Sequence, residues 1–156
     1  MDVERQENTN ILDYLLREDS FMYRQKLDAP FFALWNCVPD PYMRCGCHPE
    51  IVERLWDQIG PALPKDCRGI VCLTPALVHP QTGIILALAM GTEYVLRLPG
   101  TLGADAISKG ARTVAKWSTG ATTDIRRTFG DDWVFGAWLK DELTWCNRAY
   151  EMFTST

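Results

Sequence analysis

The fold class follows from one stretch of the chain, residues 69–99, which reads GIVCLTPALVHPQTGIILALAMGTEYVLRLP. Four short apolar runs, at 70–73, 76–79, 84–90 and 93–98, are separated by turn residues. The sequence HPQTG between the second and third runs suits a hairpin loop, and the GT before the fourth has the length of a two-residue hairpin turn. The pattern predicts an antiparallel β-meander.

The third and fourth runs differ in how their apolar residues alternate. Residues 84–90, IILALAM, show no alternation, which indicates a central strand covered on both faces. In residues 93–98, EYVLRL, the tyrosine and the leucines share one face, whereas Glu93, Val95 and Arg97 share the other. We expect the first of these faces to be buried and the second to be partly in contact with water.

Helical periodicity flanks the meander on both sides. Apolar residues recur at helical spacing, and helices are expected at residues 10–18, 49–59, 101–110 and 139–153. Asn10 and Thr101 are placed to cap the first and third helices, and Pro49 suits the first position of the second.

The remaining segments are short. The pattern predicts one more strand at residues 112–117. The pattern at residues 122–129 is consistent with either a helix or an edge strand, and the run at 133–135 is too short to assign. The whole pattern predicts a single α+β domain over residues 1–156, with an antiparallel β-meander of about four to five strands packed by three to four helices.

Composition narrows the class of partner and the compartment. The net charge of -4 argues against a nucleic-acid partner, because such binding rests on clustered Lys and Arg. The longest apolar run, residues 84–90, is far shorter than the roughly 20 residues that span a membrane. The acidic N-terminus is unlike a signal peptide, so a cytoplasmic location and six reduced cysteines are expected. None of these features specifies an oligomeric state.

One cluster has metal-ligand chemistry, the run Cys45-Gly46-Cys47-His48. Thiolate and imidazole are preferred zinc ligands, so Cys45, Cys47 and His48 are candidate ligands in one interpretation. The alternative is a glycine-kinked loop with half-buried thiols, in which His48 caps the helix that begins at Pro49.

The same region resembles part of an enzyme signature. His48-Pro49-Glu50, followed by Cys67 and Cys72, is similar to the His-x-Glu and Pro-Cys-x-x-Cys elements of the zinc-dependent nucleobase deaminases. The resemblance implies that the histidine and both cysteines hold zinc and that the glutamate moves protons. It covers those five positions, and it departs from the family because no proline precedes Cys67 and the two cysteines are five residues apart.

A second cluster combines charged and aromatic residues near the C-terminal third of the chain. Charges that border aromatic side chains are typical of protein interfaces, although a solvated turn beside core aromatics has the same composition. The predicted partner-binding residues are Trp117, Asp124, Arg126, Arg127, Asp131, Asp132 and Trp133.

The functional expectation rests on these two clusters. The chain has no phosphate-binding glycine loop, and neither of its histidines, His48 and His79, lies beside a recognisable nucleophile signature. We therefore expect a non-enzymatic protein that binds another protein and needs no cofactor, for instance an acidic cytosolic inhibitor or immunity protein. The alternative is a small zinc-binding domain or deaminase-like hydrolase built on residues 45–50.

Overall fold

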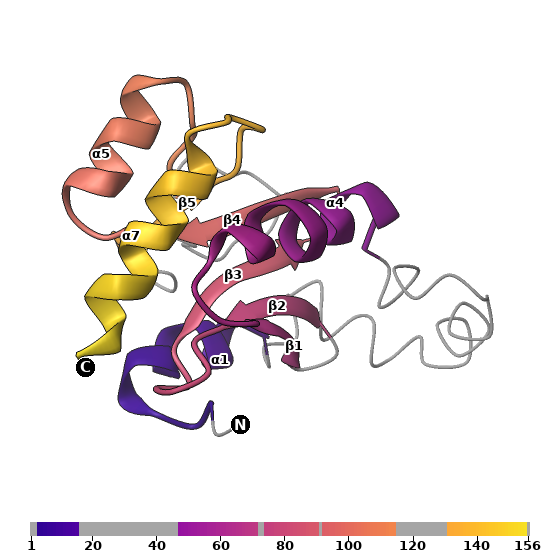
Figure 1. The fold of residues 1–156 in the computed structure, drawn as a ribbon, viewed down its shortest axis with the longest axis vertical. Coiled ribbons are helices and arrows are strands. Elements are labelled where there is room, and N and C mark those ends of the chain that lie inside the picture. Colours follow the sequence, from indigo (N-terminus) through magenta and orange to yellow (C-terminus); the bar gives the residue numbers. More distant parts are fainter. Residues whose placement is uncertain (1–2, 16–46, 72–73, 91, 115–130, 156) are drawn as a thin grey trace.

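The computed structural model describes residues 3–15, 47–71, 74–90, 92–114 and 131–155 (Figure 1). Its centre is a five-stranded antiparallel sheet in which neighbouring strands follow the order of the chain. The strands are β1 (Arg68–Val71), β2 (Thr74–Val78), β3 (Ile85–Met90), β4 (Glu93–Arg97) and β5 (Trp133–Phe135). The predicted α+β fold with a β-meander is confirmed.

The turns between strands follow from local sequence. Met90 pairs with Glu93, so only two residues join β3 to β4, as predicted. The β2–β3 loop is closed by the Gly83 N–H, which donates to the His79 carbonyl at 2.8 Å. β3 lies between β2 and β4 with its first five residues buried, which confirms its prediction as a central strand.

Seven helical segments complete the described residues. They are η1 (Gln6–Asn8), α1 (Thr9–Leu15), α4 (Pro49–Glu53), the π-helical η2 (Arg54–Ile59), η3 (Gly60–Ala62), α5 (Thr101–Ser108) and α7 (Glu142–Thr154). None of the described helices is long and apolar enough to cross a membrane.

Two predicted caps are wrong. A 3₁₀ turn precedes α1, so the helix begins at Thr9 and Asn10 lies inside it. In α5 the capping position belongs to Gly100, whose φ of 61° suits glycine, and Thr101 is the first helical residue. The expected strand at residues 112–117 is limited, in the part described here, to a single bridge between Thr113 and Val134.

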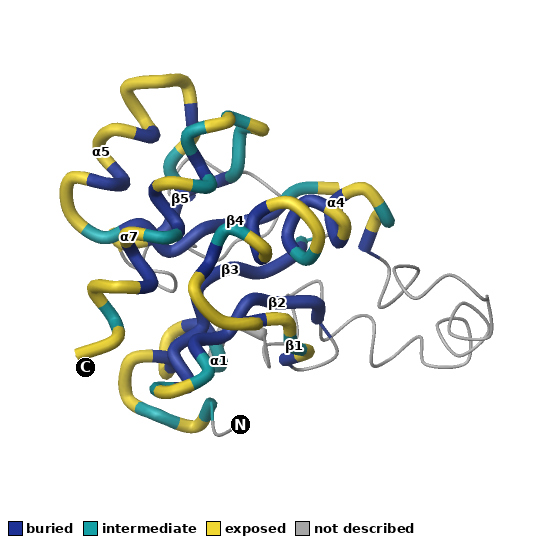
Figure 2. The backbone as a smooth tube through the Cα atoms, viewed as in Figure 1, coloured by how far each residue is buried: buried dark blue, intermediate teal, exposed yellow. Residues whose placement is uncertain are grey.

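The sheet separates two buried clusters. One face packs against α4, η2, α5 and α7, and the other packs against α1, which contributes Ile11 (Figure 1). Figure 2 shows that burial runs through β2, β3 and β4. On the face that was expected to be partly wet, Val95 is fully buried and Arg97 is 6% exposed, so the expectation is wrong for these two residues. It holds for Glu93 at the start of the strand, whose side chain is partly exposed.

Arg97 is buried because aromatic and main-chain groups enclose it. Its guanidinium lies 4.8 Å from the centre of the Trp133 ring, and its Nη2 donates to the Glu7 carbonyl at 3.1 Å. Burial lowers the pKa of Arg97 to about 10, and the carboxylates of Asp132 and Glu7 oppose that shift. The side chain therefore remains charged at neutral pH.

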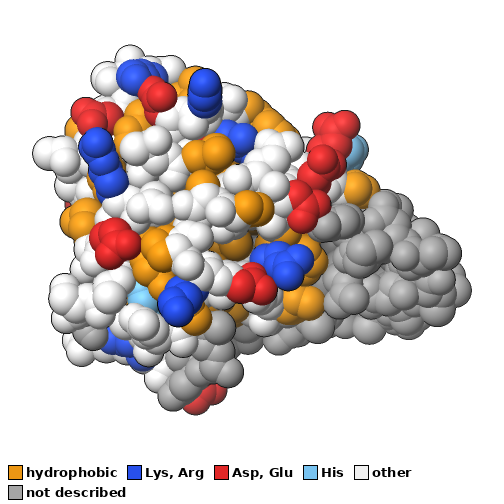
Figure 3. All heavy atoms as spheres, in the orientation of Figure 1, with side chains coloured by type: hydrophobic (Ala, Val, Ile, Leu, Met, Phe, Trp, Pro, Cys, Tyr) orange, Lys and Arg blue, Asp and Glu red, His pale blue; other side chains and the backbone are white. Residues whose placement is uncertain are grey.

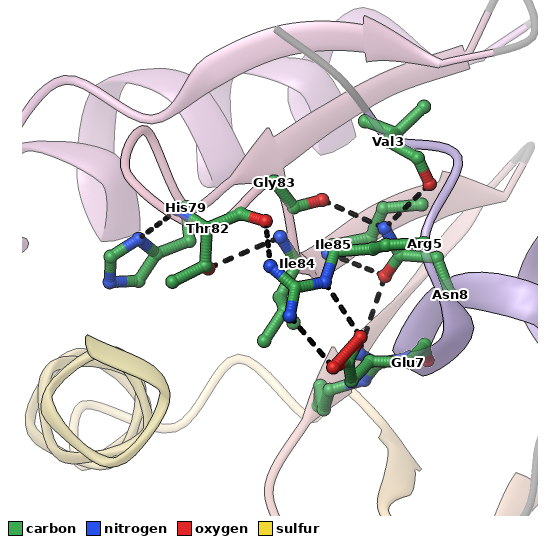
Figure 4. A network of polar contacts seen from close by, with 10 residues as sticks. Val3, Arg5, Glu7, Asn8, His79, Thr82, Gly83, Ile84 and Ile85 are labelled. Carbon is green, nitrogen blue, oxygen red and sulfur yellow. Dashed lines mark hydrogen bonds and ion pairs between the residues drawn. The ribbon is translucent and has the colours of Figure 1, made fainter. Parts of the chain in front are cut away.

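Asn8 fastens the N-terminal segment to the sheet (Figure 4). Its Nδ2 donates to the Val3 carbonyl at 3.0 Å and to the Gly83 carbonyl at 2.7 Å. Its Oδ1 accepts from the Ile85 N–H at 2.9 Å and from Arg97 Nη1 at 3.5 Å. Asn8 is fully buried with both of its donors and both of its acceptor sites in use, so the helix α1 is held on its face of the sheet.

Candidate functional site

Trp138 is a large aromatic residue that the fold leaves at the surface. It follows β5, the residue is 49% exposed, and its φ of 58° lies in the left-handed region. That region is rarely occupied by a bulky side chain and costs about 1 to 2 kcal/mol. The surrounding structure must therefore hold the residue in place.

Tyr94 provides the first part of that support, from β4. Its hydroxyl accepts a hydrogen bond from the Trp138 N–H at 2.9 Å and another from Arg54 Nε at 3.3 Å, and it donates to Glu142 Oε1. A tyrosine hydroxyl has one donor and two acceptor sites, so Tyr94 is saturated. The two aromatic rings also meet edge to face, with centres 5.5 Å apart.

An ion pair completes the support. Arg54 Nη2 donates to Glu142 Oε1 at 2.9 Å and to the Leu139 carbonyl at 2.7 Å. Glu142 Oε2 accepts from the Ala137 N–H at 2.8 Å. The loop before α7 is thus bound through Ala137, Trp138 and Leu139, and we call Arg54, Tyr94 and Glu142 the clamp.

The clamp also lies against the Trp138 ring. The guanidinium carbon of Arg54 is 5.6 Å from the ring centre, a distance typical of cation–π contacts. Arg54 begins the π-helical segment η2, a rare geometry that often occurs at functional sites. One guanidinium therefore supports both the loop backbone and its exposed aromatic side chain.

The clamp is buried and electrically balanced. Burial raises the pKa of Tyr94, and its hydrogen bond to Glu142 adds to the shift, so the phenol stays protonated. Burial acts to lower the pKa of Arg54, but its hydrogen bonds to Glu142 and Tyr94 outweigh that effect and raise it. Tyr94 and Arg54 therefore hold their protons, and the three side chains fill one another's hydrogen-bonding sites. They are arranged to position a side chain, not to react.

A glycine makes the approach of Tyr94 possible. A Cβ atom on Gly136 would lie 1.8 Å from Cε2 of the Tyr94 ring, well inside any real contact distance. The ring is fixed at its hydroxyl by three hydrogen bonds, so it has little room to move aside. Gly136 is thus required directly after β5, where the backbone lies against the Tyr94 ring.

The predicted partner-binding residues fall into three groups. Trp117, Asp124, Arg126 and Arg127 lie outside the described residues. Asp131 and Asp132 are exposed and lie in the turn directly before β5. Trp133 is 2% exposed and packs in the core between α1 and the sheet, so its ring is not available at the surface. Their role in binding stays a prediction.

Two residues of the metal prediction, Cys47 and His48, lie in the described part of the chain, and they differ in burial. His48 caps α4 by accepting the Glu50 N–H on Nδ1 at 3.1 Å, while Cys47 is fully buried in the core. Burial raises the pKa of Cys67 to about 12, with a contribution from the Asp66 carboxylate, and its thiol donates to a main-chain carbonyl.

No cluster of three or more His, Cys, Asp or Glu side chains suited to a metal ion occurs in the described part of the chain, which excludes Cys45 and Cys72. The zinc-binding alternative therefore stays a prediction. The deaminase-like interpretation, which involves His48, Glu50, Cys67 and Cys72, also stays a prediction.

His79 has a structural arrangement of its own. Its Nδ1 accepts from the N–H groups of Gln81 and Thr82, at 3.2 and 3.3 Å, and its Nε2 lies 3.1 Å from Thr154 Oγ1. Because the Thr154 hydroxyl donates to the Tyr150 carbonyl, it accepts from His79, which places the imidazole proton on Nε2. His79 therefore joins the β2–β3 loop to α7 as a neutral ring.

Two surface hollows lie away from the clamp. One, of about 450 Å³, is lined by residues from Trp56 to Arg68 around η3. The other, of about 320 Å³, lies between Ala62 and the side of α7 that carries Leu143, Asn147 and Arg148. Neither hollow contains a member of the clamp or Trp138.

No family model, curated protein or solved structure matches the chain. Its function must therefore be argued from the geometry of its own residues.

Sequence reasoning missed the clamp for a specific reason. Arg54 and Glu142 each interrupt the apolar pattern of a predicted helix, and opposite charges within two such patterns are a usable signal. That signal does not show that residues 88 positions apart meet. Trp138 is one of six tryptophans in the chain, and the sequence does not distinguish it from the buried Trp133.

Proposed function

We propose that this chain binds another protein through the surface centred on Trp138. The observation that supports the proposal is an exposed tryptophan with positive φ, held by a buried and saturated clamp. Tryptophan, tyrosine and arginine are the residues most enriched among those that dominate binding energy at protein interfaces. Here Trp138 is exposed and is supported from below by Tyr94 and Arg54.

Stability alone does not account for this arrangement. Desolvation makes a buried ion pair no better, and often worse, for stability than apolar residues of the same volume. The left-handed backbone at Trp138 adds a further cost. Strained residues that the surrounding structure over-determines cluster at binding and catalytic sites. A preorganised aromatic side chain also loses less conformational entropy when a partner binds.

A catalytic role for this site has less support than a binding role. Catalysis requires a group that reaches the substrate and exchanges a proton or electron pair. Tyr94 and Glu142 are buried, and their hydrogen-bonding atoms are engaged with each other, with Arg54 and with main-chain N–H groups. The exposed group is the indole of Trp138, and an indole is better suited to protein binding than to acid–base catalysis.

The test is an affinity capture with matched variants. Wild type, Trp138→Ala and Ile107→Ala are immobilised and exposed to an extract of the cells that produce the protein. Ile107 is a suitable control, because it is exposed to a similar extent, 43%, on α5. Captured proteins are quantified by mass spectrometry, and melting temperatures verify that all three proteins are folded.

We expect a protein that wild type and Ile107→Ala retain and Trp138→Ala loses. Once that protein is purified, its affinity for Trp138→Ala should be at least about thirtyfold lower, as expected for a dominant interface residue. A captured set that is the same for wild type and Trp138→Ala would refute the proposal.

A further inference from the structure

We propose that His79 is an acid-sensitive joint: when its ring gains a second proton, the β2–β3 loop opens and releases the N-terminal segment at residues 3–8. The loop comprises residues 79–84, between the end of β2 and the start of β3. This role is separate from the binding surface at Trp138, because none of the described residues that contact the ring belongs to the clamp.

The neutral ring of His79 has both of its nitrogen atoms in use. The residue is fully buried, and Nδ1 accepts hydrogen bonds from the N–H groups of Gln81 and Thr82. On the other side, Nε2 donates to Thr154 Oγ1 at 3.1 Å. The ring also stacks on Tyr150, with ring centres 4.1 Å apart. The ring therefore fits between the loop and α7 in one protonation state.

A second proton does not fit this arrangement. It is added to Nδ1, where both hydrogen-bonding neighbours are themselves N–H donors. An imidazolium has no acceptor, so the N–H groups of Gln81 and Thr82 lose theirs and face a third donor. Burial opposes the charge as well and lowers the pKa of His79. Acid therefore protonates the ring only as the contact between Nδ1 and the loop breaks.

The groups around the ring favour opening on the side of the loop. Burial has the largest effect on the pKa of His79; a main-chain hydrogen bond at Tyr150 and the Glu151 carboxylate, both on α7, raise it, and Arg5 lowers it. Burial raises the pKa of the Tyr150 phenol, which therefore stays neutral. An imidazolium is thus attracted to α7 and repelled by Arg5, whose guanidinium contacts the loop at the Thr82 carbonyl. On the face that Figure 3 draws, Lys, Arg, Asp and Glu side chains are interspersed over α5 and α7, so no patch of one sign overrides these local groups there.

The β2–β3 loop anchors the N-terminal segment (Figure 4). The Thr82 carbonyl accepts from Arg5 Nη1, and the Gly83 carbonyl accepts from Asn8 Nδ2 at 2.7 Å. Both carbonyls lie within two residues of the N–H groups that Nδ1 holds, so a loop that turns away from the ring moves both anchors. The helix α1 follows this segment, and its Ile11 is fully buried against the sheet. Release of the segment therefore loosens the helix that covers this face.

Amide hydrogen exchange of the ¹⁵N-labelled full-length protein at pH 7.5 and pH 5.0 tests the joint. The measured rates are divided by the intrinsic rates at each pH to give protection factors. The Gly83 N–H, which donates to the His79 carbonyl, reports on the loop, and the Ile85 N–H, which donates to Asn8 Oδ1, reports on the N-terminal segment. Leu88, buried in the central strand β3, reports on unfolding of the whole sheet.

Asparagine variants separate the titration of histidine from its hydrogen bonding. In His79→Asn, Oδ1 accepts the N–H groups that Nδ1 held, as in an Asx turn, but the side chain does not titrate. His48→Asn is the matched control, because His48, the other histidine of the chain, is exposed and its Nδ1 accepts the Glu50 N–H. Glu7 does not titrate in this pH range, since its hydrogen bonds to Arg5 lower its pKa to about 2.

We expect the protection of Gly83 and Ile85 to fall at least about threefold from pH 7.5 to pH 5.0 in wild type and in His48→Asn, because one proton taken up on opening changes the equilibrium by up to about tenfold per pH unit. At pH 5.0 their protection should be at least about tenfold below that of Leu88. In His79→Asn the fall should be less than about 1.5-fold. An equal fall in His79→Asn, or protection of Gly83 and Ile85 equal to that of Leu88, would overturn the inference.

Wild type alone decides if His79→Asn does not fold. The ring resonances of His79 then give its titration midpoint, which should lie below 6.5, and the amide shifts of Gln81 and Thr82 should change with the same midpoint. A midpoint at or above 6.5, or loop amides that do not follow the ring, would overturn the inference.

Discussion

Glu142→Gln is the change that examines the clamp most directly. The amide keeps the size of the carboxylate but has only one acceptor oxygen, whereas Glu142 accepts from Arg54, Tyr94 and the Ala137 N–H. If the oxygen faces Arg54 and Tyr94, the amide group faces the Ala137 N–H, and two donors oppose each other. In either orientation Arg54 loses its counter-charge in a buried position.

The expected loss is about 3 kcal/mol of unfolding free energy. Removing one partner of a buried ion pair costs about 3 to 5 kcal/mol, and the amide keeps part of the hydrogen bonding. For a chain of this length the melting temperature should fall by about 6 to 12 °C. The neighbouring Asp141 provides the control, because its pair with Lys109 is exposed and Asp141→Asn should cost about 0.2 to 1 kcal/mol.

Urea denaturation at pH 7, followed by tryptophan fluorescence and circular dichroism, measures both variants. A loss for Glu142→Gln no larger than that for Asp141→Asn would refute the account of the clamp. The double variant Arg54→Met/Glu142→Leu contains neither charge. Its loss of unfolding free energy should be smaller than the sum of the losses of the two single variants, because no buried charge is left without its counter-charge. Strict additivity would show that the two residues do not act together.

Three more predictions concern other residues of the fold. In the same assay, Gly136→Ala should lower the unfolding free energy by more than about 3 kcal/mol, because the new methyl group overlaps the Tyr94 ring. A loss below about 1 kcal/mol would contradict this packing. Asn8→Ala should lower the unfolding free energy by about 3 kcal/mol, since it leaves the Gly83 carbonyl and the Ile85 N–H without their partner. An unchanged denaturation midpoint would mean that Asn8 does not fix the N-terminal segment to the sheet. Burial lowers the pKa of His79 below its ordinary 6.5, so the unfolded state binds the proton first and the unfolding free energy should fall as the pH drops below about 6.5. Denaturation midpoints measured between pH 7.5 and 5.5 should therefore depend less steeply on pH in His79→Gln than in wild type. Equal slopes would contradict this role of His79.

Local patterns predicted the elements of this fold with small errors at their ends. The strands β3 and β4, the two-residue connection between them and the helix beginning at Pro49 all follow from short-range chemistry: β-branched and apolar runs, turn residues and a favoured first helical position. The errors have local causes too. A 3₁₀ turn displaced the expected cap at Asn10, and Gly100 took the position expected for Thr101.

Other features depended on segments far apart in the chain. Residues 133–135 form the fifth strand because β4 offers them a pairing edge, although α5 lies between the two strands in the chain. Arg97 is buried because the N-terminal segment and Trp133 close over it, which no pattern within β4 reveals. The same applies to Trp133 and Trp138, which are alike in sequence and opposite in exposure.

The sequence by itself determined the α+β class, the meander and the helices that flank it, because hydrophobic periodicity and turn chemistry act over a few residues. It also supplied the acidic balance and the aromatic content that suggested a binding protein. Only the tertiary structure decided which tryptophan is exposed and that Arg54, Tyr94 and Glu142 meet beneath it. These contacts join positions 40 to 88 residues apart, where packing, and no local rule, sets the distance.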